Sequence, residues 1–99
     1  MKYRRLGKTE LQISAVGVGT WQLGNHWGKH FEQDEVNGIF SHATDLGVNL
    51  VDTAECYGHH VSESFIGHAL KSNRHDWIIA TKFGHNRKSE LPGDAHWQA

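Results

Sequence analysis

The sequence predicts an α/β fold in which a short β-hairpin precedes a β-α-β-α-β unit. Three apolar, strand-like runs are centred near Val18, Leu50 and Ile79, about 30 residues apart, which is the spacing of successive βα units in a parallel sheet. The two stretches between these runs carry apolar residues at helical spacing. The chain of 99 residues is 37% hydrophobic and 21% charged, which is a globular composition and enough length for one domain.

The amino-terminal segment is predicted to form the hairpin. Short extended stretches are expected over Tyr3–Leu6 and Leu11–Ser14. Gly7 lies in the turn between them and supplies the positive φ that hairpin turns need. The run Ala15–Thr20 is rich in Val and Gly and lacks alternation, which is typical of a strand buried on both faces. The stretch Trp21–Phe31 is expected to be an irregular loop.

The first helix is predicted to begin at about Asp34 and to end at Gly47. Its apolar stripe follows the helical period and consists of Val36, Ile39, Phe40, Ala43 and Leu46. Asp34 and Glu35 place negative charge at the start of the helix, where the helix dipole favours it. Gly47 suits a left-handed cap, and the second strand, Val48–Asp52, follows directly.

A second helix and a third strand complete the predicted unit. The apolar stripe of this helix consists of Val61, Phe65, Ile66, Ala69 and Leu70. Ser62 is the expected amino-terminal cap, because a serine hydroxyl can accept a hydrogen bond from a free backbone N–H of the first turn. The run Trp77–Thr81 is continuously apolar up to its last residue and is predicted to be the third strand.

Parallel strands joined by crossover helices belong either to an open doubly wound sheet or to a (β/α)8 TIM barrel. An open sheet that binds a dinucleotide carries the motif Gly-x-Gly-x-x-Gly after its first strand. Here Gly17 and Gly19 are followed by Gln22, where the third glycine is needed. This mismatch favours the barrel, of which the chain would form the amino-terminal part.

The charge balance and the single cysteine limit the partners and the compartment. Ten Lys and Arg against eleven Asp and Glu give a net charge of −1 without a basic stripe, so nucleic acid and anionic membranes are not expected partners. Cys56 is the only cysteine, which excludes an internal disulfide and favours a reducing compartment. No apolar run has the length of a secretory signal or of a membrane span. We therefore expect a cytoplasmic protein.

Three residues carry the expected chemistry. Asp52 ends the second strand, Lys82 follows the third, and Tyr57 lies in the loop after Asp52. Adjacent strands are about 4.8 Å apart, so Asp52 and Lys82 can meet at the carboxyl end of the sheet, where barrel active sites are built. A buried Asp52–Lys82 pair would fix the ammonium, which would stabilise the phenolate of Tyr57 and make it a proton donor to a carbonyl oxygen.

Structural explanations of the same residues stay open. Asp52 and Lys82 can equally form a structural ion pair, with Tyr57 a loop aromatic, because structural ion pairs occur in many folds. His59 and His60 follow Cys56 closely, but no further ligand completes a tetrahedral set, so no metal site is expected. Cys56 is expected to fill space. Trp21 and Trp27 either line a substrate pocket or pack the loop against the barrel mouth.

Several segments, in order and at the right spacing, resemble the amino-terminal portion of the aldo-keto reductases. They are Tyr3-Arg4-Arg5-Leu6-Gly7, Leu11-Gln12-Ile13-Ser14, Gly17-Val18-Gly19-Thr20-Trp21, Asn49-Leu50-Val51-Asp52-Thr53-Ala54-Glu55-Cys56-Tyr57-Gly58, Ser62-Glu63 and Ala80-Thr81-Lys82-Phe83-Gly84. The resemblance implies a (β/α)8 barrel with the hairpin closing its bottom. It also implies reduction of aldehydes and ketones to alcohols with NADPH, a small-molecule carbonyl substrate and no metal.

The resemblance also implies roles for individual residues. Tyr57 is expected to donate the proton, Lys82 to make that proton easier to lose, and Asp52 to hold Lys82. Gly19, Thr20 and Trp21 match the segment near the nicotinamide end of the cofactor, and Asp52 is expected beside them. A histidine that completes the family's catalytic tetrad lies at the end of the fourth strand, so none of the nine histidines present is assigned to it.

A full (β/α)8 barrel needs about 250 residues, so the chain is expected to supply three of the eight βα steps. We therefore expect residues 1–99 to be a single partial domain, with 85–99 as a loop or disordered tail. The expected function is that of an incomplete portion of a reductase. The alternative is a non-catalytic βαβαβ module that binds a partner through its open edge. The open sheet edges also predict self-association.

Overall fold

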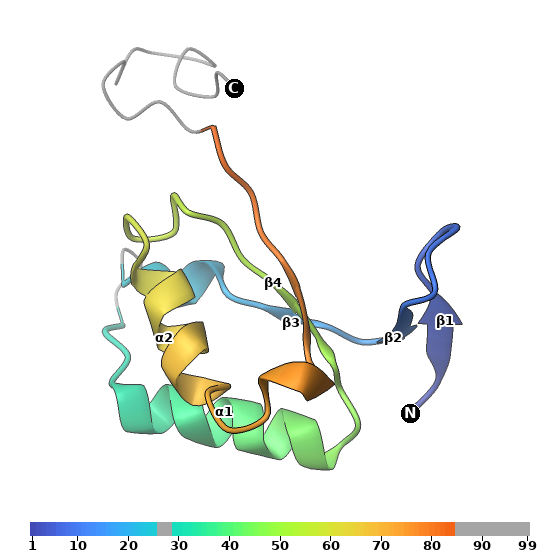
Figure 1. The fold of residues 1–99 in the computed structure, drawn as a ribbon. Coiled ribbons are helices and arrows are strands. Elements are labelled where there is room, and N and C mark those ends of the chain that lie inside the picture. Colours follow the sequence, from blue (N-terminus) through green and yellow to red (C-terminus); the bar gives the residue numbers. More distant parts are fainter. Residues whose placement is uncertain (26–28, 85–99) are drawn as a thin grey trace.

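The computed structural model describes residues 1–25 and 29–84, which form a β-hairpin followed by a parallel sheet with two helices (Figure 1). In chain order the elements are β1 (Tyr3–Arg5), β2 (Gln12–Ser14), β3 (Val18–Gly19), the 3-10 helix η1 (Trp21–Gly24), α1 (Gln33–Asp45), β4 (Leu50–Asp52), α2 (Val61–Ala69), the 3-10 helix η2 (Arg74–Asp76) and β5 (Ile78–Ala80). Figure 1 shows α1 and α2 together on one side, while the hairpin stands apart at the other end. The predicted order of elements is confirmed.

The three parallel strands lie in the order β3-β4-β5. Val51 pairs with Val18 on one side and with Ile79 on the other, and these three residues lie against the core. Because side chains alternate along a strand, Leu50 and Asp52 lie on the opposite face. That face is the one that would line a barrel interior.

The strands are shorter than predicted, most clearly β3. The sequence predicts a strand over Ala15–Thr20, whereas only Val18–Gly19 pair with β4. β3 has a pairing partner on one side only among the described residues, and the backbone before it bends, so the ladder ends early. Part of the predicted irregular loop is ordered as η1, and the predicted pocket residue Trp27 lies outside the described residues.

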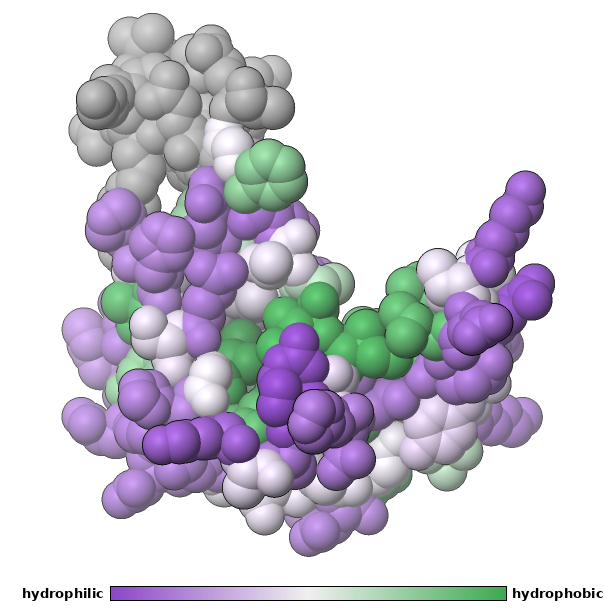
Figure 2. All heavy atoms as spheres, viewed as in Figure 1, coloured by the Kyte–Doolittle hydropathy of each residue, from purple (hydrophilic) through white to green (hydrophobic). Residues whose placement is uncertain are grey.

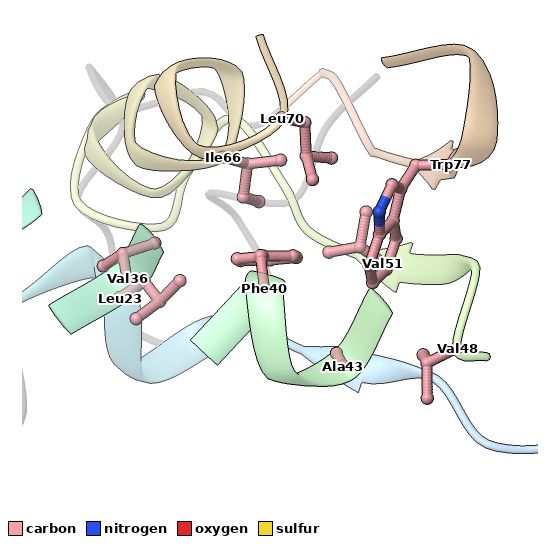
Figure 3. Close-up of a cluster of buried hydrophobic side chains, with 9 residues drawn as sticks. All are labelled: Leu23, Val36, Phe40, Ala43, Val48, Val51, Ile66, Leu70 and Trp77. Carbon is pink, nitrogen blue, oxygen red and sulfur yellow. The ribbon is translucent and has the colours of Figure 1, made fainter. Parts of the chain in front are cut away.

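Both helices pack on one face of the parallel sheet and form a single core. The buried apolar cluster drawn in Figure 3 consists of Leu23, Val36, Phe40, Ala43, Val48, Val51, Ile66, Leu70 and Trp77. The rings of Phe40 and Trp77 meet edge to face with centroids 5.2 Å apart. The indole N–H of Trp77 donates a hydrogen bond of 3.1 Å to Thr44, so the one polar atom of this buried ring is satisfied.

Two residues of the predicted α1 stripe are exposed. Ile39 is 40% and Leu46 is 57% exposed, although the stripe places both toward the core. The two side chains lie seven residues apart and therefore on one flank of the helix. In a (β/α)8 barrel each helix has neighbours on both sides in an outer ring, but the described residues provide α1 with α2 alone.

The helix ends differ from the prediction in an informative way. α1 begins one residue earlier than expected, because Glu32 caps it and forms a capping box with Glu35. Ser62 does not cap α2. The cap position is His60, and Ser62 lies fully buried in the first turn. The predicted left-handed Gly47 after α1 is confirmed, with φ of 86°.

The hairpin joins the sheet through Asn49, the residue before β4. The side-chain oxygen of Asn49 accepts a hydrogen bond of 2.7 Å from the backbone N–H of Ser14, and its side-chain nitrogen donates to the carbonyl of Gln12. The hairpin therefore meets the amino ends of the parallel strands. Its turn contains Gly7 at φ 55°, as predicted. The single partial domain over 1–99, with its tail at 85–99, extends beyond the described residues and stays a prediction.

Candidate functional site

The candidate site lies where the parallel strands end. Gly19 is in register with Asp52, and Asp52 with Ala80, so the carboxyl ends of β3, β4 and β5 are level. The ladder of β4 and β5 continues past the strands, since the N–H of Glu55 donates to the carbonyl of Lys82. Parallel strands bring residues that follow them to one edge of the sheet, and Lys82 is thereby placed beside Asp52.

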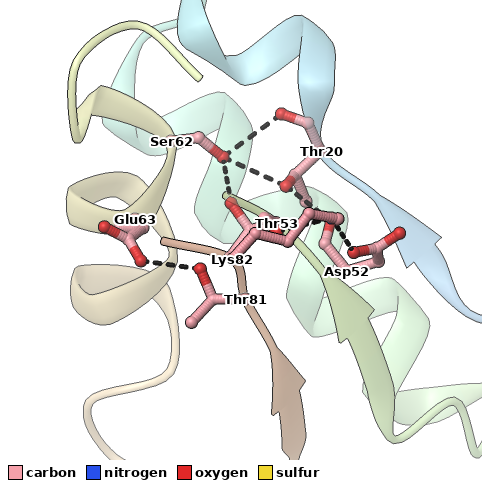
Figure 4. Close-up of polar contacts among 7 residues, drawn as sticks. All are labelled: Thr20, Asp52, Thr53, Ser62, Glu63, Thr81 and Lys82. Atoms are coloured by element: carbon pink, nitrogen blue, oxygen red, sulfur yellow. Dashed lines mark hydrogen bonds and ion pairs between the residues drawn. The ribbon is translucent and has the colours of Figure 1, made fainter. Parts of the chain in front are cut away.

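Lys82 and Asp52 form the ion pair that the sequence predicts. Lys82 Nζ lies 2.7 Å from Asp52 Oδ1 and donates a second hydrogen bond of 2.9 Å to the backbone carbonyl of Thr53 (Figure 4). The prediction that this pair is buried is wrong, because the side chains are 48% and 59% exposed. The pair lies on the sheet face that the two helices do not cover, and only further strands would enclose it.

Tyr57 lies against the same ammonium. Lys82 Nζ is 5.4 Å from the centroid of the Tyr57 ring, within the range of a cation–π contact. The hydrogen bond with Asp52 is the main cause that raises the pKa of Lys82 above its ordinary value, partial burial acts against it, and Tyr57 adds to the increase. The three predicted catalytic side chains are therefore assembled at one point, with Lys82 between the other two.

The loop that carries Tyr57 has an unusual backbone. Gly58, His59 and His60 all have φ between 54° and 72°, which is the left-handed region. Residues other than glycine rarely adopt this region, so the backbone at His59 and His60 is strained. The loop closes on α2, since the N–H of Ser62 donates to the carbonyl of Tyr57. This tight closure fixes where the Tyr57 side chain leaves the backbone.

The residues expected near a nicotinamide fall into two groups. Gly19 is exposed, and no described atom lies within 4 Å of a Cβ placed there. Trp21 is also exposed. Thr20 is buried instead, and its hydroxyl donates a hydrogen bond of 2.8 Å to the backbone carbonyl of Asp52. Gly19 thus leaves open space beside Asp52, whereas the Thr20 side chain faces into the fold.

A model of the aldo/keto reductase family matches residues 15–99. The chain belongs to the aldo/keto reductase family. It is 39% identical over 97 residues to the uncharacterized oxidoreductase YqkF of Bacillus subtilis. The alignment covers 98% of this chain and 29% of that protein.

Solved structures of the family agree with the fold. Aldo-keto reductase AKR11C1 of Bacillus halodurans, in its holo form, matches with a TM-score of 0.76 and 35% identity over 94% of this chain and 29% of that one. An aldo/keto reductase of Klebsiella pneumoniae in complex with NADP and acetate matches with a TM-score of 0.63 and 26% identity, over 73% of this chain and 24% of that one. The predicted family and barrel class are confirmed. The chain spans less than a third of the length of these relatives.

Sequence reasoning missed the contacts among a second set of polar residues next to Asp52 and Lys82. Thr20, Thr53 and Ser62 form a buried hydroxyl cluster, and Glu63 accepts a hydrogen bond from Thr81 (Figure 4). The available signal was a threonine directly after each of the three parallel strands: Thr20, Thr53 and Thr81. The sequence predicts Ser62 as a cap. Its actual hydrogen-bond partners come from segments far away along the chain, so the local sequence does not indicate them.

The structure gives the remaining candidates no site of their own. Within residues 1–25 and 29–84, no group of three His, Cys, Asp or Glu side chains is placed to hold a metal ion. His60 pairs with Glu63 at 3.0 Å, and Cys56 is half-buried with a free thiol. Over the same ranges, none of the helices has the length and apolar character needed to cross a membrane.

Proposed function

We propose that these residues form the proton-donating half of a reductase that converts aldehydes and ketones to alcohols with NADPH. The observation that carries the proposal is the position of Lys82 Nζ, 2.7 Å from Asp52 Oδ1 and 5.4 Å from the Tyr57 ring centroid. An ammonium anchored by a carboxylate beside a phenol is suited to stabilise the phenolate that forms when the phenol gives up its proton.

In the proposed reaction each of the three side chains has a separate task. Tyr57 donates its hydroxyl proton to the carbonyl oxygen of the substrate, which becomes the alcohol oxygen. The Lys82 ammonium stabilises the phenolate left on Tyr57, and the phenolate regains a proton from water. Asp52 keeps the ammonium charged and in place. A nicotinamide cofactor, when bound beside these residues, would supply the hydride for the carbonyl carbon.

The residues around the triad fit a flat nicotinamide ring. Gly19 leaves open space beside Asp52 that a side chain would occupy, and Trp21, two residues further along the chain, is 48% exposed. Thr20 would contribute through its backbone, since its hydroxyl is engaged with Asp52. The Klebsiella relative is a complex with NADP and acetate, and this supports the choice of cofactor. Residues that hold the cofactor phosphates are expected in the part of the barrel that the chain does not span.

The whole activity belongs to a complete barrel. We therefore define a chimeric reductase in which residues 1–84 replace the matching segment of YqkF, the relative that aligns over 97 residues.

The proposed substrates are carbonyl compounds of low molecular weight, that is, small aldehydes and ketones. No described histidine is assigned to the fourth position of the family's tetrad.

The test compares the two tyrosines of the chain in the chimeric reductase. Tyr57→Phe removes the proposed proton donor, so NADPH-dependent reduction of a reactive aromatic aldehyde should fall by about 10²–10⁴-fold. Tyr3→Phe removes a hydroxyl that donates from the hairpin to the backbone carbonyl of Gly47 after α1, and turnover should stay near the parent value. Equal turnover in the Tyr57→Phe and parent proteins would contradict the proposal.

A further inference from the structure

A closed cluster of three hydroxyl groups lies directly behind the ion pair. Thr20, Thr53 and Ser62 are each at most 1% exposed. Ser62 Oγ lies 2.9 Å from Thr53 Oγ1 and 3.0 Å from Thr20 Oγ1. The three residues come from different segments, since Thr20 follows β3, Thr53 follows β4 and Ser62 lies in the first turn of α2. The cluster therefore joins a helix to two strand ends.

The hydroxyl groups of this cluster donate their hydrogen bonds in one consistent order. The hydroxyl of Thr20 donates to the backbone carbonyl of Asp52 at 2.8 Å, so its oxygen is left to accept from Ser62. Ser62 has a single proton, which it donates toward Thr20, whose hydroxyl oxygen lies at 3.0 Å and whose backbone carbonyl oxygen lies at 3.2 Å. With that proton given to Thr20, the Ser62 oxygen accepts from Thr53. The order Thr53 to Ser62 to Thr20 to Asp52 satisfies every hydroxyl, and such chains polarise and strengthen one another in a dry interior.

Both ends of the chain of hydroxyls lie on the groups that hold the Lys82 ammonium. At one end, the Asp52 carbonyl receives hydrogen bonds from the hydroxyl and the N–H of Thr20, while the Asp52 carboxylate holds Nζ. At the other end, the backbone carbonyl of Thr53 accepts the second hydrogen bond from Nζ. The hydroxyl cluster thus fixes Asp52 and Thr53 in place. The Asp52 carboxylate and the Thr53 carbonyl oxygen stay available to accept hydrogen bonds from Lys82.

The residue after Ser62 reaches the third strand end. Glu63 Oε2 accepts a hydrogen bond of 2.8 Å from the hydroxyl of Thr81, which directly precedes Lys82. The first turn of α2 therefore reaches the segments after β3, β4 and β5, as Figure 4 shows. An amino-terminal cap would need none of these contacts, so capping does not explain the buried serine.

We propose that Ser62 is a positioning residue that holds the Lys82 ammonium in place through Thr53, Thr20 and Asp52. The proposal rests on the proposed function, because a fixed ammonium serves the reaction only if Lys82 acts on Tyr57. Ser62 itself touches none of the reacting groups. Its hydroxyl acts by keeping the two acceptors of Nζ at the right separation.

The first test titrates Lys82 in the full 99-residue chain by carbon-13 NMR of labelled lysine. In the parent the pKa of Lys82 should lie above its ordinary value of 10.5, since the ammonium is held by Asp52. In Ser62→Ala the acceptors loosen and the pKa should fall toward 10.5. Ser64→Ala, an exposed serine of the same helix turn, is the matched control and should titrate like the parent.

Two further variants separate positioning from folding. Thr53→Val keeps the shape but removes the donor to Ser62, and Thr53→Ser keeps the hydroxyl. The proposal expects the pKa of Lys82 to fall in the first and to stay raised in the second. It is overturned if folded Ser62→Ala and Thr53→Val titrate like the parent, or if the parent titrates at the ordinary value. It is also overturned if both variants unfold, because the cluster would then only hold the fold.

The second test measures kcat and KM in the chimeric reductase. Ser62→Ala should lower kcat roughly 10- to 100-fold, as expected for a misplaced catalytic group, with little change in KM for the aldehyde. A rise in KM at constant kcat would contradict positioning. If the parent chimera has no turnover while the Lys82 titrations follow the expected pattern, the proposed function fails and the positioning of the ammonium stands.

Discussion

Gly24 and Gly58 touch backbone to backbone. A Cβ placed on Gly24 would lie 2.7 Å from the backbone nitrogen of Gly58 and 2.7 Å from the carbonyl carbon of Tyr57. Gly58 also has φ of 71°, which glycine adopts without strain. The contact joins η1, after β3, to the loop that carries Tyr57. Two residues without side chains thus set how close the proposed proton donor comes to the end of the first parallel strand.

The first prediction concerns this contact. Gly24→Ala should push the Tyr57–Gly58 backbone outward, because the atoms in its way are backbone atoms that cannot rotate aside. We expect a loss of about 1–3 kcal/mol in the free energy of unfolding, as for overpacked sites. Urea denaturation of the chain at one fixed concentration measures it. In the chimeric reductase the same change should lower kcat.

Two other glycines provide the control. Gly38 in α1 and Gly67 in α2 have no described atom within 4 Å of a Cβ placed on them, so alanine fits there. Alanine at either site should stabilise the chain by about 0.5–1 kcal/mol, because it restricts the unfolded backbone and favours the helix. Similar effects of Gly24→Ala and Gly38→Ala would show that the Gly24–Gly58 contact has no structural weight.

The second prediction concerns acid. The hydrogen bond with His60 is the main cause that lowers the pKa of Glu63, burial opposes it, and the Thr81 hydroxyl adds to the decrease. A carboxyl with a lower pKa in the folded state than in the unfolded state stabilises the fold above its unfolded pKa. This contribution is therefore fully present above about pH 4.5 and is lost as the pH falls through the folded pKa.

Glu63→Gln should remove that dependence. Between about pH 5 and pH 3, the free energy of unfolding should fall less steeply in Glu63→Gln than in the parent. Glu10→Gln, in the exposed hairpin turn, is the matched control and should follow the parent curve. Urea denaturation across this pH range gives both slopes, and parallel curves for the parent and Glu63→Gln would refute the role of Glu63.

The sequence was sufficient for the order of the elements and for the meeting of Asp52 with Lys82. Both follow from regular geometry: period-3.6 stripes separate three apolar runs, and parallel strands bring their carboxyl ends together. The family motif added Tyr57, which geometry alone could place only somewhere in a loop. The register aligns Asp52 with Ala80. Lys82 therefore lies only two residues beyond the position opposite Asp52, and its side chain can reach the carboxylate.

What the sequence could not provide depends on packing between distant segments. Ser62 resembles a cap locally, and its buried role appears only when Thr20 and Thr53 are brought to it by β3 and β4. The exposure of Ile39 and Leu46 depends on which neighbours surround α1, and the amphipathic stripe carries no information on that. A positive φ is uncommon at any residue other than glycine, so the sequence alone does not indicate the left-handed backbone of His60.

The third prediction is that the 99-residue chain alone lacks useful reductase activity. Hydride transfer requires the cofactor to be held against the carbonyl, and the chain spans less than a third of its relatives. Purified chain at high concentration, with NADPH and a reactive aldehyde, should turn over far below about 1 per second. Turnover near that value would show that the segment is catalytically complete.

The last prediction is that the isolated chain self-associates through its parallel sheet. Among the described residues β3 and β5 are edge strands, each with unpaired backbone groups on one side, and such edges pair readily with other chains. The face opposite the helices carries half-buried Leu50 and Ile78 in register with each other. Figure 2 shows a continuous apolar strip across the molecule, in the angle between the main body and the hairpin.

Burial of these surfaces supplies the driving force. A large apolar side chain that leaves water contributes about 1.5–3 kcal/mol, so a few such residues from each of two copies sustain an association. Light scattering on fresh chain should therefore show a mass above 11.2 kDa, and hydrogen exchange should show protected amides in β4 and in the edge strands. A monodisperse monomer with a cooperative melt would contradict this.

A pair of charge variants identifies the surface involved. Ile78→Lys places an ammonium on the uncovered sheet face, where a second copy would have to bury it, so the chain should become monomeric. Ile39→Lys places the same charge on the exposed flank of α1, and the chain should still associate. The reverse result would locate the contact on the helix flank, and dissociation by neither variant would exclude both surfaces. Because the charge added is the same, the difference between the two variants reports the position of the interface and not the change in net charge.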